Sequence, residues 1–381
     1  MKFSRSAPAV LIGAVAVVIA VVTFVSNEIS HRMAASFEAE NFSLMGKIAH
    51  SKLSGAETKA LSAAELLAAS GAVRDAFAAR DKDGLHAVVK EAFAVQREKY
   101  GMSQAQFHLA PATSFLRVHN PKRPAEDLSH YRQIVLEVNH AKAARKGIEI
   151  TTSGLSVFGV LPMLDVDGTH IGSFEMGLEL GPLLDELKKT YSFETALFID
   201  EKMLRETTTS LSADILNEQN RFGKFIKFYS THGELLRQLA DGDDLNVVEE
   251  SHYLRHAAGT PYGVLLQPVY NYAKKQIGVL LVAKDFSATR SADGQATVWQ
   301  VLLGVVSVVA LIGVILIVVR GLLLRPLRQV GDRVAALAEG RDADADAVEV
   351  AGCDEVRDLA ENVEKLRARL TGAAQTEGGA P

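Results

Sequence analysis

The sequence has almost no cysteine. Among its 381 residues there is one, Cys353, so no disulfide can form within the chain. If part of this chain is exported, that part must be stabilised by its own hydrophobic core and not by disulfides. This is common in the bacterial periplasm, where oxidation is permitted but not required.

The chain also lacks an excess of positive charge. Lysine and arginine number 41 against 46 aspartate and glutamate, which gives a formal net charge of −5. A nucleic-acid-binding protein normally carries a basic face, so this class is excluded, while the mild acidity indicates no particular partner. The length allows two or three compact units.

Motifs for catalysis are missing as well. The histidines do not follow metal-ligand spacing, Cys353 has no histidine near it in sequence, and no glycine-rich phosphate loop is present. We therefore expect a protein that is not an enzyme and holds no cofactor and no metal.

Two long uncharged runs are present instead. Residues 7–25 and 298–319 contain no charged side chain. At 1.5 Å per residue, either run is long enough to cross a hydrocarbon layer of roughly 30 Å. The sequence predicts transmembrane helices at 7–26 and 298–319.

The charges beside these runs predict their orientation. Lys2 and Arg5 precede the first run and Glu28 follows it, while four arginines follow the second: Arg320, Arg325, Arg328 and Arg333. Positive charge marks the cytoplasmic side. We expect both termini, including residues 1–6, in the cytoplasm of a bacterium. Residues 27–297 would then lie on the periplasmic side of the inner membrane.

A cleaved signal peptide is the alternative for the first run. Its apolar stretch exceeds the usual 7–15 residues and no small-x-small site closes it. A membrane anchor is therefore favoured.

A long helix is predicted directly after the first span, from residue 27 to about 70. Apolar residues recur at helical spacing, as in Ile29, Met33 and Phe37. The helix would reach roughly 60 Å, more than a small domain needs. Because its apolar stripe is narrow, we expect it to be a stalk that pairs with a second copy in a homodimer. A second helical pattern extends the stalk region to residue 100.

The hydrophobic period then changes to two. For a distal module at 101–190 we expect strands at 104–109, 114–119, 157–164 and 171–180, and a linking helix at 182–190. A helix is also expected at 127–143, with Asp127 or Ser129 as its N-cap.

A proximal module is expected at 191–290. Strands at 193–200 and 203–208 would pair, a helix would follow at 232–239, and a hairpin would close the module at 263–270 and 277–284. A short sequence pattern occurs once in each module. The distal module has Gly159-Val160-Leu161 followed by Ile171-Gly172, and the proximal module has Gly263-Val264-Leu265 followed by Ile277-Gly278. The repeat favours two tandem modules of the same α/β (α+β) fold, although β-hairpins also converge on such residues by chance.

A candidate ligand site lies in the strand at 114–119. Alternation places Leu116 and Val118 on one face and Phe115, Arg117 and His119 on the other. A half-buried guanidinium needs a partner, and a ligand carboxylate can accept its two parallel hydrogen bonds. Two residues of the following helix, Tyr131 and Arg132, would complete the pocket.

Structural roles remain open for the same residues. Arg117 would then pair with Glu175 or Asp127, His119 would hydrogen-bond a loop carbonyl, and Tyr131 would pack in the core. Lys122 and Arg123 are interpreted as a solvated turn.

Beyond the second span, two heptad patterns follow one another. The apolar positions are Leu323, Leu327, Val330, Val334 and Leu337, then Val356, Leu359, Val363, Leu366 and Leu370. Two short helices of this kind cannot bury their seams alone, so pairing in a dimer would give a parallel four-helix coiled coil. The alternatives are an ordinary helical hairpin, or a helix on the lipid surface. The acidic residues of the second helix argue against the lipid surface.

These residues resemble a HAMP domain, the relay module of bacterial chemoreceptors and sensor kinases. The resemblance covers about residues 320–371 and rests on Arg325-Pro326-Leu327, Leu337-Ala338-Glu339-Gly340 and Asp354-Glu355-Val356. It implies a relay role for Pro326, Leu327, Glu339, Gly340, Asp354 and Glu355. Arg357 departs from the family, which often has glycine there. Residues 372–381 are expected to form a disordered tail.

The region between the spans resembles a double Cache domain, the PAS-like sensor of such receptors. The resemblance covers roughly residues 27–285. It is carried most clearly by Phe107-His108-Leu109, Pro111, the strand from Ser114 to His119, Asp127-Leu128 and Arg132. It implies a small-molecule ligand in the distal module. A carboxylate or an amino acid is our expectation.

No kinase, cyclase or methylated hairpin pattern follows residue 370. We therefore expect a signal-transduction receptor whose output comes from a separate chemotaxis or two-component protein, or a chain that is a fragment of a longer receptor. A structural scaffold subunit of the membrane, with no ligand, is the rival hypothesis.

Overall fold

The computed structural model describes residues 3–152, 154–208, 214–339 and 354–377. They divide into two units, one comprising residues 36–289 and the other comprising the residues before and after it. One helix, α1 (Phe3–Ala68), contributes to both.

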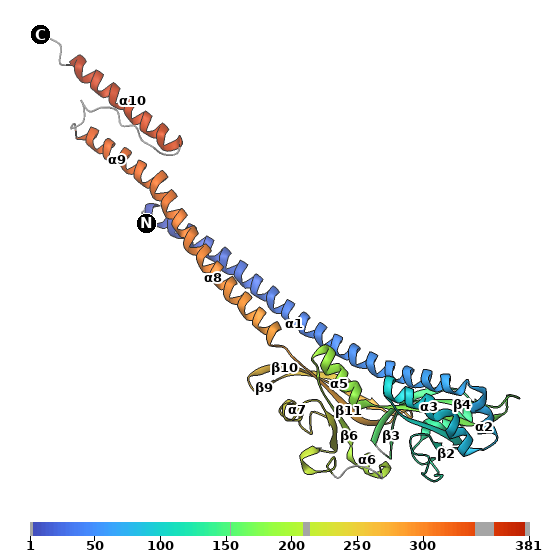
Figure 1. Ribbon diagram of the computed structural model, residues 1–381. Coiled ribbons are helices and arrows are strands. Elements are labelled where there is room, and N and C mark those ends of the chain that lie inside the picture. Colours follow the sequence, from blue (N-terminus) through green and yellow to red (C-terminus); the bar gives the residue numbers. More distant parts are fainter. Residues whose placement is uncertain (1–2, 153, 209–213, 340–353, 378–381) are drawn as a thin grey trace. The chain divides into compact units, whose positions relative to one another are not determined.

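The larger unit contains two antiparallel sheets (Figure 1). After α1 come α2 (Gly71–Ala78) and α3 (Lys82–Tyr100). The first sheet has the order β2-β1-β5-β4-β3. Its strands are β1 (Met102–Leu109), β2 (Thr113–Arg117), β3 (Arg145–Thr151), β4 (Gly154–Leu164) and β5 (His170–Glu179). With α4 (Gln133–Ala141) they form the distal module, and α5 (Leu180–Tyr191) leads out of it.

The second sheet repeats this order as β7-β8-β6-β11-β10-β9. Its strands are β6 (Glu194–Asp200), β7 (Arg221–Phe222), β8 (Phe225–Ser230), β9 (Ser251–Ala257), β10 (Thr260–Tyr270) and β11 (Gln276–Asp285). The helices of this proximal module are α6 (Glu201–Thr207), the 3₁₀ turn Glu218–Asn220 and α7 (Gly233–Leu239). Both modules thus place their last two strands at the centre, in agreement with the predicted duplication.

The repeated glycines have matching surroundings. A Cβ at Gly172 would lie 2.1 Å from the carbonyl oxygen of His108 on β1, and a Cβ at Gly278 would lie 2.1 Å from that of Phe198 on β6. Only glycine permits these close approaches.

Two predicted elements are wrong. Residues 203–207 belong to helix α6 and Thr208 is its C-cap residue. The Asp200 carboxylate caps the start of this helix by accepting the N–H of Met203 at 3.0 Å. The strand β6 pairs instead with β8 and β11. The helix predicted at 127–143 begins only at Gln133, since Asp127 forms a β-bridge with Thr113 and the chain before Gln133 is a loop.

One continuous hydrophobic core joins both sheets to the helices. It contains Phe107, Phe174 and Met176 from the first sheet and Leu197 and Leu280 from the second. The part of α1 in this unit buries mainly small side chains against it: Ala49, Ala56, Ala60, Ala63, Ala64 and Ala68. The stripe that the sequence singled out on this helix is exposed at Phe37 and Leu44, because the alanine face permits the closer approach.

The second unit contains α8 (Ser287–Val318), a π-helical segment (Val319–Leu324), α9 (Arg325–Ala338) and α10 (Asp354–Glu377). The helix α10 continues to Glu377, so the disordered tail predicted from residue 372 is wrong over this stretch. Alanine and glutamine at Ala373, Ala374 and Gln375 are compatible with a longer helix.

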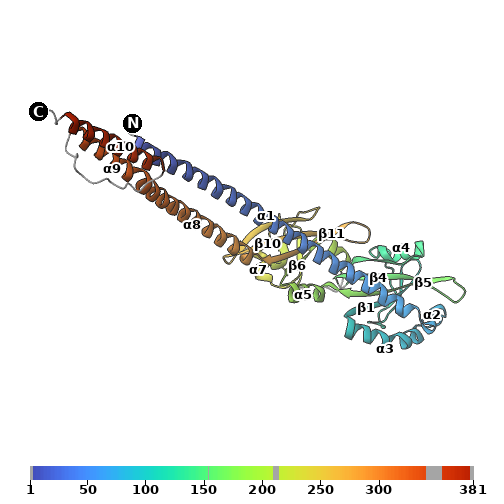
Figure 2. The same cartoon turned by 90° about the horizontal axis from the view of Figure 1, so that it is seen from above.

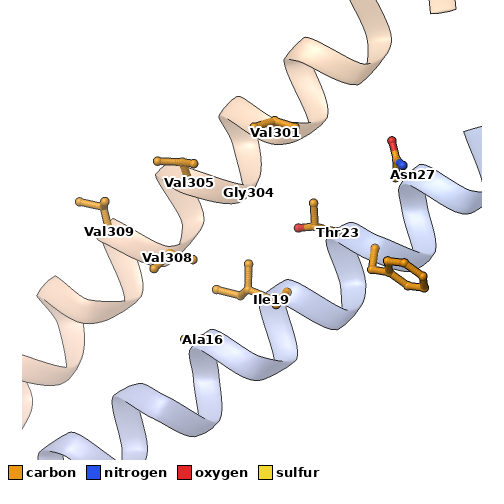
Figure 3. Close-up of a pocket in the computed structure, with 11 residues that line it drawn as sticks. Ala16, Ile19, Thr23, Asn27, Val301, Gly304, Val305, Val308 and Val309 are labelled. Carbon is orange, nitrogen blue, oxygen red and sulfur yellow. The ribbon is translucent and has the colours of Figure 1, made fainter.

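Two helices are long and apolar enough to cross a membrane, within α1 and from α8 into α9. Figure 3 shows the first part of α1 beside α8, with Ile19 and Thr23 facing Gly304 and Val308. A hollow of about 610 Å³ between them is lined mainly by apolar residues, with Thr23 and Asn27 as the polar ones. Outside it, large apolar side chains such as Val22 and Ile317 are exposed, which suits a lipid environment.

A close approach of α1 to the first sheet gives a prediction. A Cβ at Gly159 of β4 would lie 2.1 Å from the backbone nitrogen of Leu61, whereas a Cβ at Gly55, also on α1, would meet nothing within 4 Å. We expect Gly159→Ala to lower the free energy of unfolding by about 1–3 kcal/mol through overpacking. Gly55→Ala should raise it by up to about 1 kcal/mol through helix propensity.

Thermal and denaturant unfolding of the full chain in detergent measures both effects. Equal responses of the two variants would contradict this packing.

Candidate functional site

The two faces of the distal sheet differ in chemistry. On one face, Phe107 of β1 lies beside Leu116 of β2 and Phe174 of β5, and all three belong to the core shared with α1 and α3. On the other face, Gln106 lies beside Arg117 and Glu175. Figure 2 shows α3 and α4 on opposite sides of this sheet. The polar face is therefore the one on the side of α4.

Buried polar residues gather on this face. Of the twelve polar or charged residues that are buried in the described part of the chain, eleven belong to the distal module. Nine of these lie on its strands and share the face of Gln106 by strand pairing: Gln106, His108, Ser114, Arg117, Glu149, Thr151, Ser156, Ser173 and Glu175. Buried polar groups require partners, so this face is built for polar contacts.

The outer face of the proximal sheet is apolar. Its buried strand residues include Phe198, Val264, Val279 and Leu281, and the leucines of α7 cover them. Thr195, the twelfth buried polar residue, lies on β6. The two modules share a topology but not this chemistry.

An ion cluster occupies the centre of the polar face. The Arg132 guanidinium donates from Nε to Glu149 at 2.8 Å and from Nη1 and Nη2 to the two oxygens of Glu175 at 3.0 and 2.5 Å. It also stacks over Phe158 at 4.2 Å. All three charged side chains are at most 3% exposed. A buried group of this kind persists only when its hydrogen bonds are satisfied.

Glu149 has a second role, because its other oxygen accepts the N–H of Ile134 at 2.9 Å. Ile134 lies in the first turn of α4, whose N-cap residue, Arg132, makes no side-chain cap bond. A carboxylate at a helix N-terminus satisfies a free N–H and complements the helix dipole. The cap of α4 therefore comes from β3, not from Asp127 or Ser129 as predicted.

Burial and charge shift the pKa values of this cluster in different directions. Burial raises the pKa of Glu149. For Glu175, burial acts in the same direction, but the attraction of the Arg132 guanidinium outweighs it and lowers the pKa to about 2. Burial lowers the pKa of His108, whose Nε2 lies 3.6 Å from Glu175. Arg132 and Glu175 are thus charged at neutral pH and His108 is neutral.

A second cluster lies at the β2 edge, around Glu126. Arg117 donates from Nη2 to Glu126 at 2.7 Å, Arg123 donates to the same oxygen at 3.0 Å, and the Tyr131 hydroxyl donates to the other oxygen at 3.2 Å. Arg117 is 6% exposed and Glu126 is 33% exposed. Burial lowers the pKa of Arg117 and raises that of Tyr131 to about 12.

The structure thus brings Arg117 and Tyr131 together through Glu126 and directs Arg132 elsewhere. Glu175, a suggested partner of Arg117, pairs with Arg132 instead. His119 lies with Nδ1 3.3 Å from the backbone nitrogen of Ala105 and 3.2 Å from its carbonyl oxygen. Ala105 belongs to β1, so His119 contacts the backbone of a strand and not the loop carbonyl of the structural alternative.

Phe115 does not share the face of Arg117. A β-bulge between β1 and β2 leaves Phe115 without a paired residue, and a bulge interrupts the alternation of side chains. Phe115 packs on the hydrophobic core with its ring 5.6 Å from that of Phe77. The predicted alternation is wrong at this residue.

Glu126, Glu149 and the role of Arg123 were missed by sequence reasoning. Two signals were available: Glu126 lies three residues from Arg123 in a loop, and Glu149 is a lone carboxylate between two isoleucines of a strand. Neither signal names the partner, because the partners come together only in the fold.

A cavity of about 280 Å³ lies beside the site. It is lined by Tyr131 and Glu149 from the distal module and by Glu206, Asn271 and Lys275 from the proximal module. Within the described residues, no group of three or more histidine, cysteine or carboxylate side chains is arranged to hold a metal ion.

The predicted relay residues that the structure describes lie in or at the ends of α9 and α10. Pro326 is buried in the first turn of α9, Leu327 is exposed, and Glu339 is the C-cap residue. The helix α10 begins at Asp354 and Glu355, while Gly340 lies outside the described residues. Val330 and Val356 are buried against each other's helix, and Arg333 pairs with Glu364 at 3.2 Å.

Comparison with protein families identifies the class. The chain belongs to the family described as the double sensory domain of two-component sensor kinases, whose model matches residues 46–289. The model of the HAMP domain matches residues 318–372. The predicted double Cache and HAMP assignments are therefore confirmed, and the chain is a sensor that relays signals. With the two apolar helices, these domains fit a membrane-anchored protein.

Several solved structures show a distant similarity to this chain. The extracellular ligand-binding receptor of Desulfohalobium retbaense shares 11% identity at a TM-score of 0.35, over 64% of this chain and 39% of that one. This chain therefore spans about two fifths of that receptor's length. The ligand-binding domain of the Campylobacter jejuni chemoreceptor Tlp3 shares 10% identity with 4-methylisoleucine bound (TM-score 0.41, 68% of this chain and 94% of that one). The structure of the same Tlp3 domain with L-valine bound shares 9% identity at a TM-score of 0.42, over 69% of this chain and 97% of that one. No curated protein sequence matches.

The ion cluster gives a prediction for stability. Arg132→Met should lower the free energy of unfolding by about 3–5 kcal/mol, because it leaves two carboxylates buried without a cation. Arg145→Met is the matched control. The Arg145 side chain is 33% exposed, lies 3.6 Å from Glu137 and donates to the Tyr272 hydroxyl at 2.9 Å, so its loss should cost at most about 1.5 kcal/mol. Denaturant unfolding of both variants measures these changes in stability. A small loss of stability for Arg132→Met would contradict the proposed contribution of the ion cluster.

Proposed function

We propose that the chain is a receptor of the bacterial inner membrane whose distal module binds a small anionic metabolite, a carboxylate or an amino acid. The observation that carries the proposal is the polar face of the distal sheet. A core that served packing alone would be apolar, as in the proximal module. Polar groups in this position are suited to a polar ligand.

Arg117 and Tyr131 are the proposed ligand contacts. Arg117 is nearly buried, always charged and placed at the edge of the polar face, where a carboxylate can accept its parallel hydrogen bonds. Arg132 already donates to two carboxylates of the protein, so we assign it a positioning role. We assign structural roles to Phe115, which packs on the hydrophobic core, and to His119, which contacts the backbone of β1.

The proposed orientation places residues 27–297 outside the membrane and both termini inside. The arginines after α8 support it through the positive-inside rule. Ligand binding would change the signalling state of the receptor by shifting the equilibrium between two arrangements of α1 and α8. It can do so only if the ligand binds one arrangement more tightly than the other.

We further propose a homodimer. In the described part of α9 and α10, the apolar residues Leu327, Val334, Leu359 and Leu366 are 44–56% exposed. These are seam positions of the heptads, and a second copy would cover them in a four-helix bundle. The signal would then pass to a separate output protein of a chemotaxis or two-component pathway.

Ligand binding is tested by thermal unfolding of the full chain in lipid nanodiscs. We expect at least one member of a panel of carboxylates and amino acids, including succinate, propionate, L-valine and L-glutamate, to raise the melting temperature. A ligand at about 100 times its Kd contributes about 2.7 kcal/mol. Arg117→Ala should abolish this rise.

Arg255→Ala serves as the matched control, because Arg255 also forms a two-bond ion pair, with Asp244, in the proximal module. The Arg255→Ala variant should retain the rise in melting temperature that the ligand causes. If no panel member shifts the melting temperature and the chain co-purifies with a membrane protein, the scaffold hypothesis replaces the receptor hypothesis.

The dimer is tested by cross-linking in membranes. After Cys353→Ser, Leu359→Cys should form an intermolecular disulfide under mild oxidation, since facing seam positions bring Cα atoms within about 7 Å. Asp358→Cys, an exposed neighbour one position off the seam, should form much less. Similar yields of the two variants would exclude this coiled coil.

A further inference from the structure

The Glu126 carboxylate is surrounded by a complete set of donors. One oxygen accepts from Arg117 at 2.7 Å and from Arg123 at 3.0 Å, and the other accepts from the Tyr131 hydroxyl at 3.2 Å. Two guanidinium groups and a phenol around one carboxylate form the arrangement that proteins use to recognise carboxylate ligands.

The donors are held in place by contacts other than Glu126. Arg117 extends from β2 and also donates to the carbonyl oxygen of Pro124 at 3.3 Å. Arg123 donates to the Thr152 hydroxyl at 3.2 Å. Tyr131 packs against the cluster formed by α4 and β4. The recognition site would therefore keep its shape if Glu126 left it.

The backbone of Glu126 is fixed, but its side chain has a route out. The Glu126 carbonyl oxygen accepts the N–H of Ser114 at 2.9 Å, and the N–H of Leu128 donates to Ala112 at 2.8 Å. The side chain is one-third exposed. A change of rotamer is thus enough to move the carboxylate into solvent once its hydrogen bonds open.

Charge favours an incoming anion. The cluster contains two cations, Arg117 and Arg123, and the single carboxylate of Glu126, so its net charge is positive. Replacing one carboxylate by another leaves this balance unchanged, so no buried charge is left without a partner during the exchange.

We propose that Arg117, Arg123 and Tyr131 form a carboxylate-binding subsite that Glu126 occupies in the free receptor, and that the carboxylate of the ligand displaces Glu126. The inference rests on the proposed function, because it assumes an anionic ligand in the distal module. It adds Arg123 to the site and makes Glu126 an internal competitor.

Competition has a measurable consequence. A tethered carboxylate has a high effective concentration at the subsite, and the apparent affinity of a ligand falls by the fraction of receptors in which the subsite is free. Weak monocarboxylates such as acetate should therefore not bind the wild type detectably. The receptor would respond only to anions with further contacts on the polar face.

The test is chemical rescue of Glu126→Ala with acetate, which replaces the group that the substitution removes. In the full chain in nanodiscs, we expect the melting temperature of this variant to fall by about 2–6 °C. Sodium acetate should restore at least half of that fall. Sodium chloride at the same ionic strength of about 0.15 M, and acetamide at the same concentration, should not.

Glu201→Ala is the matched control. Glu201 also accepts from two arginines, Arg205 and Arg221, but these are 48% and 38% exposed. Acetate should not restore the stability of this variant. Rescue of both variants alike, or of neither, overturns the proposal.

Glu126→Gln provides a second measurement if the alanine variant does not fold. It keeps the size of the side chain and removes the charge, so we expect acetate to raise its melting temperature while leaving the wild type unchanged. Any carboxylate found by the panel should bind this variant about tenfold more tightly. An unchanged or weaker affinity would show that Glu126 does not compete.

Failure of this inference is distinguishable from failure of the proposed function. Acetate rescue without any response of the wild type to the panel would support the subsite and leave the receptor function unsupported. A panel response with no effect of Glu126 would support the function and overturn the competition.

Discussion

The distal module depends on one guanidinium, that of Arg132. It neutralises Glu175 and binds Glu149 inside a sheet face where neither carboxylate has access to water. Through Glu149 it also holds the N-terminus of α4. This allows the face to remain polar, since the desolvation of each charge is offset by hydrogen bonds from the others. The Arg117 site lies on the same face of the sheet.

The two modules show how one fold supports two roles. Their sheets have the same strand order, and Gly172 and Gly278 meet the neighbouring strand in the same way. The outer face of the distal sheet is polar and that of the proximal sheet is apolar. In the distal module this face is available for recognition, whereas in the proximal module it is filled by the leucines of α7. Both inner faces belong to one core with α1, so the modules are mechanically connected.

Much of the fold could be predicted from the sequence, because it rests on local patterns. Uncharged runs of sufficient length predicted the apolar helices, and period-two alternation predicted the strands β1, β4, β5, β10 and β11. Errors occurred where a single side chain decided the local structure. Asp200 capped a helix where a strand was expected, and the bulge at Phe115 turned one ring towards α2. The site was predictable only in part, since Arg117 was recognised but Glu126 was not.

The sequence by itself determined the order of the parts: an apolar helix, two related modules, a second apolar helix and paired heptads. These follow from hydrophobic period and residue spacing, which are properties of neighbouring residues. Only the tertiary structure decided which charges meet. Arg132 lies 17 residues from Glu149 and 43 from Glu175, and many arginines and carboxylates are equally available in the chain. The choice among them is made by the fold, because strand pairing brings Glu149 and Glu175 onto one face and the start of α4 places Arg132 against them.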